Sequence, residues 1–151
     1  MIFQRRPIKF RVWDLEDKKW LGPEVLMCLT DGRIWNYLYV ADEPTFWSSN
    51  QRGSRAVLLQ YTGLKDCTDT EIYDGDIVTH VNAPRGFEDY YVVQLTVYGP
   101  VYIEVSTAKL PLLPSSEYGR MMVVAGNIFE NPQLVGGKVE VIDAKVESID
   151  D

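Results

Sequence analysis

The stretch Leu58–Val81, LLQYTGLKDCTDTEIYDGDIVTHV, decides the fold because strand-forming runs alternate in it with dense turn formers. The apolar runs Ala56–Tyr61 and Ile77–Val81 predict two buried strands. Between them, Gly63 and Gly75 can adopt the positive φ values that other residues resist. Three acidic side chains of this stretch can accept hydrogen bonds from nearby backbone N–H groups and so hold tight turns: Asp66, Asp69 and Asp74.

Upstream, the pattern of side chains predicts further strands. Aliphatic or aromatic residues alternate with Lys9, Arg11 and Trp13 over residues 8–13, which predicts a strand with one aliphatic and one largely basic face. The β-prone runs Val25–Leu29 and Arg33–Val40 flank an Asp-Gly pair, so they predict a hairpin. Residues 41–55 are polar and contain proline and glycine, which predicts a loop.

Downstream, the strand signals continue at close spacing. Tyr90–Tyr98 and Val101–Val105 predict two strands across a turn at Gly99-Pro100, and Met121–Ala125 predicts the last clear strand. Leu110–Pro114 carries two prolines and fits an edge strand or an extended link. Short strands separated by Gly/Pro turns predict a mainly β fold, as a small barrel or open sandwich.

The C-terminal residues have a different pattern. In residues 136–151, Val139, Ile142, Val146 and Ile149 are spaced by 3, 4 and 3, which fits one face of a short helix. The β-branched content of the segment also allows a strand. An apolar face of either kind must pack on the domain or on a neighbouring subunit. We therefore divide the chain into a β domain, 1–135, and a C-terminal extension, 136–151, that is a candidate oligomer contact.

Composition restricts the class of protein. The chain has 151 residues, 46% of them hydrophobic, which is the size and content of one ordinary domain. One His and two Cys leave little material for metal sites, for histidine catalysis or for disulfides. No apolar run reaches the roughly 18 residues of a membrane span, and the charged N-terminus does not resemble a secretory signal. The chain is therefore expected in the cytoplasm, with both cysteines as free thiols.

The charge is unevenly distributed along the chain. Residues 1–60 hold 9 basic and 7 acidic side chains, whereas residues 61–151 hold 6 and 15, so the net charges are +2 and −9. The total of −7 predicts that nucleic-acid phosphates repel the chain as a whole. Only the N-terminal part has the sign of charge that could attract them.

Three segments together resemble a known protein family. They are IKFRVWD at Ile8–Asp14, the block Leu58–Val78, and VVAGNIFENPQL at Val123–Leu134. In this order and at this spacing they resemble the YopX family of phage- and prophage-encoded proteins. The resemblance implies a β-rich fold with an SH3-like barrel portion, a phage or prophage origin, and assembly into oligomers. It implies no catalytic or ligand-binding residues.

The residues of these motifs are the candidate site. We expect them to have a structural role, as turn formers, turn caps and packing residues: Tyr61, Gly63, Asp66, Tyr73, Gly75, Asp76, Asn127 and Asn131. Alternatively, six side chains of this block line a binding surface: Tyr61, Lys65, Asp66, Tyr73, Asp74 and Asp76. The five carboxylates of residues 66–76 also invite a divalent-cation site. Their spacing does not match the twelve-residue calcium loop, however, and we assign no metal and no cofactor.

No catalytic constellation is present in the sequence. His80 has no nucleophile or ligand partner at a recognisable spacing, and Cys67 lies among acidic residues that disfavour its thiolate. The leading hypothesis is therefore a non-enzymatic accessory protein that binds a protein partner or assembles with itself as a homo-oligomer. An enzyme with an unrecognised site is a further hypothesis.

A second class of function depends on the basic N-terminal segment. Its cations alternate with aromatic residues, a pattern that can hold single-stranded nucleic acid by charge and stacking: Arg5, Arg6, Lys9, Arg11, Lys18 and Lys19. A variant of the protein-binding hypothesis, based on the net charge of −7, is an acidic decoy that inhibits a DNA-binding host protein. The structural interpretation is an edge strand whose charges block aggregation and pair with the acidic half of the chain.

Overall fold

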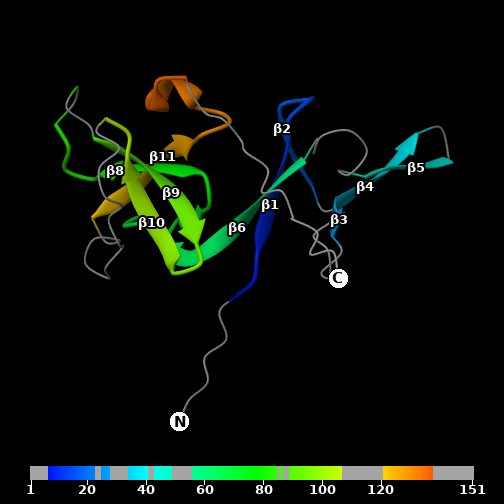
Figure 1. Ribbon diagram of the computed structural model, residues 1–151, viewed down its shortest axis with the longest axis horizontal. Coiled ribbons are helices and arrows are strands. Elements are labelled where there is room, and N and C mark those ends of the chain that lie inside the picture. The colour runs from blue at the N-terminus through cyan, green and yellow to red at the C-terminus, as the bar shows by residue number, and fades with distance from the viewer. Residues whose placement is uncertain are drawn as a thin grey trace, which may run out of the picture.

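The computed structural model describes residues 7–22, 25–27, 34–40, 43–48, 56–84, 86, 89–106 and 121–137 (Figure 1), with the backbone alone for 25–27, 34–40 and 43–48. Its elements are β1 Phe10–Asp14, β2 Lys19–Leu21, β3 Val25–Met27, β4 Ile34–Val40, β5 Glu43–Ser48, β6 Ala56–Lys65, β7 Glu71–Tyr73, β8 Asp76–His80, β9 Tyr90–Thr96, β10 Gly99–Glu104, β11 Met122–Asn127 and the 3-10 helix η1 Pro132–Val135. The prediction of a mainly β fold is therefore confirmed. The SH3-like portion stays a prediction.

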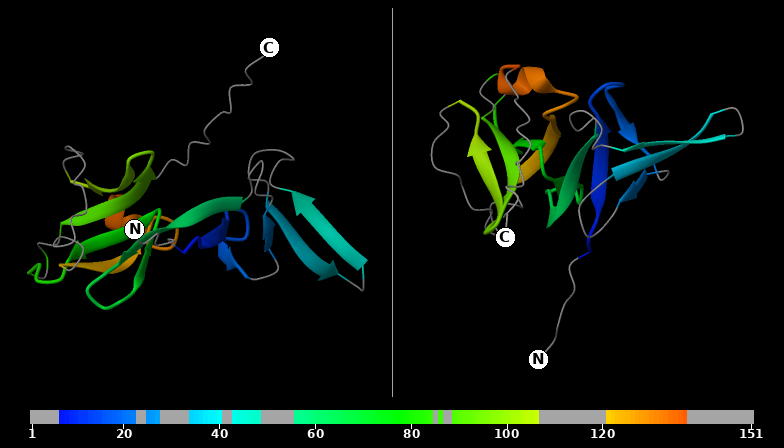
Figure 2. Two further views of the ribbon diagram at one scale, coloured as in Figure 1. Left: turned by 90° about the horizontal axis from the view of Figure 1, so that it is seen from below. Right: turned by 45° about the vertical axis from the view of Figure 1, so that its right-hand side comes forward.

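The described strands form three antiparallel sheets, with the orders β2-β1-β6-β7, β10-β9-β8-β11 and β3-β4-β5. Figures 1 and 2 show β1 and β6 crossing the middle of the molecule, with the β8–β11 sheet on one side and the β3–β5 sheet on the other. The long strand β6 pairs with β1 through its first half and with β7 through its second half. The Leu58–Val81 stretch therefore links the first two sheets.

Two clusters of buried apolar side chains form the described core. The larger joins β7 to the β8–β11 sheet, and its members are fully buried: Ile72, Val78, Val93, Tyr102 and Met122. The smaller lies under β1 and β6 and contains Val12 and Ala56, with Leu21 and Leu58 packed against them. Burial of apolar area at about 25 cal/mol per Å² is the main force that holds such sheets together.

Several predicted boundaries differ from the structure. Residues 43–48 are strand β5, not a loop, and Pro44 is tolerated because β5 is at the edge of its sheet. The turn between β9 and β10 lies at Val97-Tyr98, two residues before the predicted Gly99-Pro100. Strand β1 is not an edge strand, because β2 and β6 flank it on both sides.

Some predictions fall on residues outside the described part of the chain. These are the helix or strand over residues 139–149, the link at Leu110–Pro114, the turn between β3 and β4, Cys28, and the cations Arg5 and Arg6. The antiparallel pairing of β3 with β4 is present as the hairpin pattern predicted. Cys67 is a free and exposed thiol. Among the described residues, no helix is both long and apolar enough to cross a membrane.

Tyr102 presents a polar atom to the larger core cluster. Its side chain is fully buried, and its hydroxyl has no hydrogen-bond partner in the structure. A buried polar group without a partner costs about 1–3 kcal/mol. We expect Tyr102→Phe to raise the free energy of unfolding by about 1 kcal/mol in urea titrations. Tyr98→Phe, at a 92% exposed ring, is the matched control and should change nothing. A Tyr102→Phe variant that is less stable than the wild type would show that the Tyr102 hydroxyl has a stabilising partner in the folded protein.

Candidate functional site

Asp66 joins the turn after β6 to strand β11. One carboxylate oxygen, Oδ1, accepts hydrogen bonds from the Thr68 N–H at 2.8 Å, the Thr68 hydroxyl at 2.7 Å and the Thr70 N–H at 3.0 Å. The other oxygen, Oδ2, accepts one from the Val124 N–H at 2.9 Å. A single buried side chain therefore holds its own turn and fastens that turn to a strand distant in the sequence.

Asp66 is expected to stabilise the fold at neutral pH and not in acid. Burial raises the pKa of its carboxyl, but the N–H and hydroxyl donors outweigh burial, and the net pKa lies below the ordinary value of 3.8. A lowered pKa gives stability that is present above the unfolded-state pKa, about 4, and is lost as the pH falls through the folded-state pKa.

We therefore expect Asp66→Asn to cost about 1–3 kcal/mol at pH 7 and to cost less at pH 3. Urea unfolding at the two pH values measures both. Asp69→Asn is the matched control, because the Asp69 carboxylate is exposed and pairs with the exposed Lys65 at 2.8 Å; exposed pairs contribute about 0–1 kcal/mol. An Asp66→Asn deficit that grows in acid would contradict the assignment.

The turn Asp74–Gly75–Asp76 between β7 and β8 is held by backbone donors. Gly75 has φ of +78°, and its N–H and C=O bond to β9 and to the residue after β11. Asp74 Oδ1 accepts from the Leu95 N–H at 2.9 Å, and Asp76 Oδ2 accepts from the Tyr73 N–H at 2.7 Å. Burial raises the pKa of both carboxyls, more than these donors lower it. Both carboxylates thus have bonds within the fold.

Arg11 fills the space between two aromatic rings. Its guanidinium carbon lies 4.1 Å from the ring centre of Tyr73 and 4.7 Å from that of Trp20. Its Nη2 donates to Asp76 Oδ1 at 2.5 Å, where the Asp76 side chain is 1% exposed and that of Arg11 is 30% exposed. Because Arg11 belongs to β1 and Asp76 begins β8, this ion pair connects the β2-β1-β6-β7 sheet to the β8–β11 sheet.

A second ion pair lies beside the first. Lys9 pairs with Glu71, and its ammonium lies 5.5 Å from the ring centre of Tyr61. The Tyr61 and Tyr73 rings are 5.4 Å apart, and the Tyr73 hydroxyl donates to Glu71 at 3.0 Å. The row from Lys9 to Arg11 therefore alternates cations with rings, but these rings, Tyr61 and Tyr73, come from β6 and β7 and not from the N-terminal segment.

Three of the four described N-terminal cations, all except Lys18, are thus paired with carboxylates of the chain itself. Lys9 and Arg11 pair with the acidic half of the chain, and Lys19 pairs with Asp17 at 3.2 Å. Trp13, Tyr61 and Tyr73 are buried, so their faces are covered by protein. A nucleic acid that stacked on these rings would first have to displace internal contacts.

The Asn127 and Asn131 side chains shape the segment after β11. Asn127 Oδ1 accepts from the Phe129 N–H at 3.0 Å and the Glu130 N–H at 2.9 Å. Asn131 Oδ1 accepts from the Asn127 N–H at 3.2 Å. The register of β11 against β8 shifts between Val124 and Gly126, immediately before this turn. The two asparagines therefore fix the chain as it leaves the last strand.

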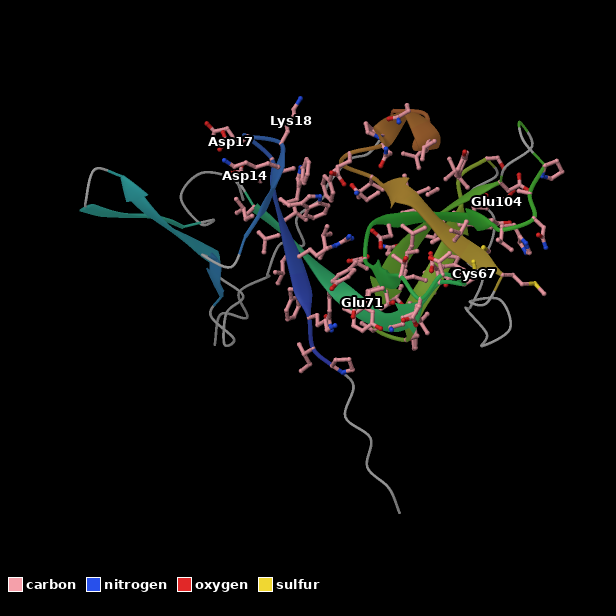
Figure 3. The ribbon with its side chains drawn as sticks, turned by 180° about the vertical axis from the view of Figure 1, so that it is seen from behind. Asp14, Asp17, Lys18, Cys67, Glu71 and Glu104 are labelled. Carbon is pink, nitrogen blue, oxygen red and sulfur yellow. The ribbon has the colours of Figure 1, made fainter. Side chains whose placement is uncertain are left out.

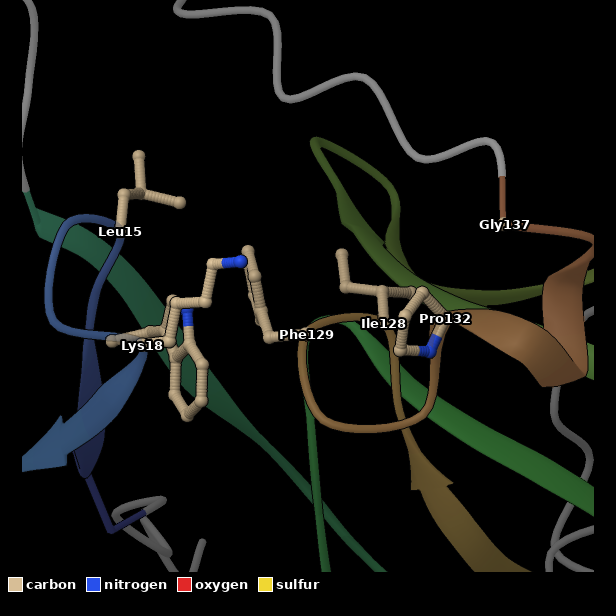
Figure 4. A pocket seen from close by; sticks show the side chains of 7 residues that line it. Leu15, Lys18, Ile128, Phe129, Pro132 and Gly137 are labelled. Carbon is tan, nitrogen blue, oxygen red and sulfur yellow. The ribbon is translucent and has the colours of Figure 1, made fainter.

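A cleft of about 240 Å³ lies between the β1–β2 hairpin and the segment that follows β11. The rings of Trp13 and Phe129 stack in it with centres 5.6 Å apart. Figure 4 shows the Lys18 side chain pointing toward Phe129 from the hairpin side, and Ile128 and Pro132 on the other side. The lining is therefore mainly apolar, with one cation.

The β9–β10 hairpin ends in an exposed apolar tip, Val97-Tyr98. These side chains are 95% and 92% exposed. The Thr96 hydroxyl donates to the Gly99 C=O at 2.8 Å and accepts from the Tyr98 N–H at 3.3 Å. Gly99 completes the turn with φ of +114°. The tip is thus held in one shape by its flanking residues.

The structure brings together only part of the predicted site. Tyr73 and Asp76 contact Arg11, the Tyr61 ring lies 5.4 Å from that of Tyr73, and Gly75 lies in the adjoining turn. Gly63, with φ of +84°, lies where the β6–β7 register shifts. Asp66 bonds to β11 instead, whereas Asn127 ends that strand and Asn131 lies after it. Figure 3 shows Glu71, Cys67 and Glu104 well separated from Asp14 and Asp17. No group of three or more described His, Cys, Asp or Glu residues has the geometry of a metal site.

The sequence did not reveal the partners of Arg11. The sequence places Arg11 only in a segment in which cations alternate with aromatic residues, and Trp20 belongs to the same segment. Their contacts depend on the pairing of β1 with β2 and β6, which joins Trp13 to Trp20 and Arg11 to Leu59. The alternation of cations and rings on one face was the available signal, and it could not identify the acidic partner.

Comparison with known proteins identifies relatives of this fold. The family model described as YopX protein matches residues 9–136. The crystal structure of protein EF1440 from Enterococcus faecalis is similar, with a TM-score of 0.62 and 24% identity over 87% of this chain and 99% of that one. Protein YopX from Bacillus subtilis has a TM-score of 0.56 and 20% identity, over 83% and 95%. No curated protein matches the chain. The family model spans most of the sequence, and the chain belongs to the YopX family.

Proposed function

We propose that this protein is a non-enzymatic phage or prophage accessory protein that binds another protein, or a second copy of itself, through the β9–β10 hairpin tip. The observation that carries the proposal is the near-complete exposure of Val97 and Tyr98. Neighbouring apolar side chains that remain exposed and so do not contribute to the core are typical of interaction sites.

The shape of the tip supports binding to a protein surface. Thr96 and Gly99 hold the turn, so little conformational freedom is lost when the tip meets a partner. Tyrosine supplies a large amphipathic contact area with few rotatable bonds and is frequent among residues that dominate binding energy. A projecting tip of this kind fits a complementary apolar hollow.

The carboxylates of the motif support a non-catalytic role. Asp66, Asp74 and Asp76 each accept hydrogen bonds from backbone groups, as described above. The nucleic-acid alternative has weaker support, because Lys9, Arg11 and Lys19 pair with carboxylates of the chain. The net charge of −7 also opposes an approach to phosphate.

The double variant Val97→Ser plus Tyr98→Ser tests the proposal. We expect the wild-type chain either to self-associate in light scattering, or to retain one identified protein in affinity purification from prophage-carrying cells. The double variant should lose that association while its urea unfolding midpoint is unchanged, since both side chains are exposed. Ile8→Ser, at a 75% exposed side chain of another segment, is the matched control and should retain it.

Two outcomes would overturn the proposal. One is a wild-type monomer that retains no protein. The other is an association that survives in the double variant as well as in the Ile8→Ser control, because the contact would then lie elsewhere on the molecule.

A further inference from the structure

The cleft beside Trp13 and Phe129 is too small for a typical bound metabolite. Its volume of about 240 Å³ lies below the roughly 300–1,000 Å³ of most ligand pockets. The lining is apolar apart from Lys18. A hollow of this size and composition suits one or two aliphatic side chains better than a cofactor.

The last described residue of the chain, Gly137, lies in the wall of this cleft. The Gly137 N–H donates to the Pro132 C=O at 2.7 Å. Gly136 and Gly137 have φ of +73° and +70°, and apart from their chain neighbours no atom of the described residues lies within 4 Å of where a Cβ would be. The backbone therefore turns at the rim without packing against other described residues. Residues 138–142 can span at most about 17 Å, so they can reach the cleft.

Residues 138–151, which follow Gly137, have apolar and acidic side chains that complement the apolar lining and the single cation of the cleft. Residues 138–151 carry apolar side chains at a spacing that would place them on one face of a helix: Val139, Ile142, Val146 and Ile149. The same segment has five acidic side chains and two lysines. At the rim, Lys18 has no ion-pair partner among the described residues. Apolar and charge complementarity therefore coincide.

We infer that residues 138–151 of the same chain dock on this cleft, with their apolar face against Trp13 and Phe129 and their carboxylates near Lys18. Attachment at Gly137 favours the same chain over a second copy, because a short connection gives an effective concentration of the order of millimolar. The inference does not depend on the hairpin tip, so either proposal can fail without the other.

Spin labelling of the full chain tests the docking. In a Cys28→Ser, Cys67→Ser background, a nitroxide on Ser148→Cys is used with backbone amide NMR signals. We expect the amides of Leu15, Lys18 and Phe129 to lose intensity in the paramagnetic sample relative to the reduced sample. Ile142→Asp should restore that intensity, whereas Val141→Asp, off the apolar face, should leave the loss in place. Lys18→Glu should reduce the loss of intensity, because it removes the cation expected to face the carboxylates of the segment.

Two samples distinguish docking within one chain from docking on a second copy. The first is ¹⁵N-enriched chain that itself carries the nitroxide, and the second is a mixture of nitroxide-carrying chain without ¹⁵N and ¹⁵N-enriched chain without nitroxide. Signal losses at the cleft in the first sample, with intact cleft signals in the mixture, support docking within one molecule. Losses in the mixture would assign the contact to a second copy and overturn the inference. Full cleft intensity in the labelled chain would also overturn it, since the segment would then lie elsewhere.

Discussion

Arg11→Met will lower the free energy of unfolding by about 3–5 kcal/mol, the cost of leaving a buried charge without its partner. The Arg11 guanidinium is the cation that faces Asp76, whose side chain is 1% exposed. Methionine retains the apolar contacts with the Tyr73 and Trp20 rings, so most of the loss reports the charge. Urea titration at pH 7 measures it.

The double variant Arg11→Met plus Asp76→Asn separates charge from packing. Asparagine keeps an oxygen for the Tyr73 N–H but has no charge to compensate. The double variant should therefore be more stable than Arg11→Met alone, a non-additivity typical of contacting residues. Lys9→Met, at the half-exposed neighbouring pair, is the control and should cost no more than about 1 kcal/mol. If Arg11→Met and Lys9→Met lowered the free energy of unfolding equally, the special role of the Arg11–Asp76 pair would be contradicted.

Gly126→Ala will cost about 3 kcal/mol, from steric overlap and a lost hydrogen bond combined. A Cβ at Gly126 would lie 2.2 Å from Asn131 Oδ1 and 2.6 Å from its Cγ. The Asn131 side chain must therefore move, and the Asn127 N–H loses its acceptor. Thermal or urea unfolding of the variant gives the magnitude.

Removal of the obstacle tests the cause of the Gly126→Ala loss. Asn131→Ala eliminates the two atoms closest to the new Cβ, so the double variant should lose less stability than the sum of the two single losses. Strict additivity would show that the cost comes from the backbone of β11 and not from Asn131.

Short-range sequence patterns predicted most of the strands, because period-two alternation and turn formers act locally. They failed where a contact with another strand or side chain overrides the preference of the residues themselves. Residues 43–48 contain Pro44 and several polar residues, yet pairing with β4 makes them a strand. The Gly99-Pro100 pair suggested a turn, but the Thr96 side chain closes the turn two residues earlier.

The motif residues show the same division between local and distant contacts. The preference of Gly75 for positive φ, and of Asp66 for its own turn, can be inferred from neighbouring letters alone. The bond from Val124 to Asp66 and the pairing of Arg11 with Asp76 cross 58 and 65 residues. Such contacts depend on which strands become neighbours, and one sequence does not specify that.

We propose that the carboxylates of residues 66–76 are engaged in hydrogen bonds and ion pairs within the fold, and that the stretch therefore binds no divalent cation. Carboxyl-carbon NMR signals of Asp66, Asp74 and Asp76, followed through a pH titration with and without Mg²⁺ or Ca²⁺, test it most directly. We predict a pKa below the ordinary aspartate value for Asp66, values above it for Asp74 and Asp76, and no change when the cation is added. Carboxyl signals that shift together as either cation saturates the protein would contradict the account.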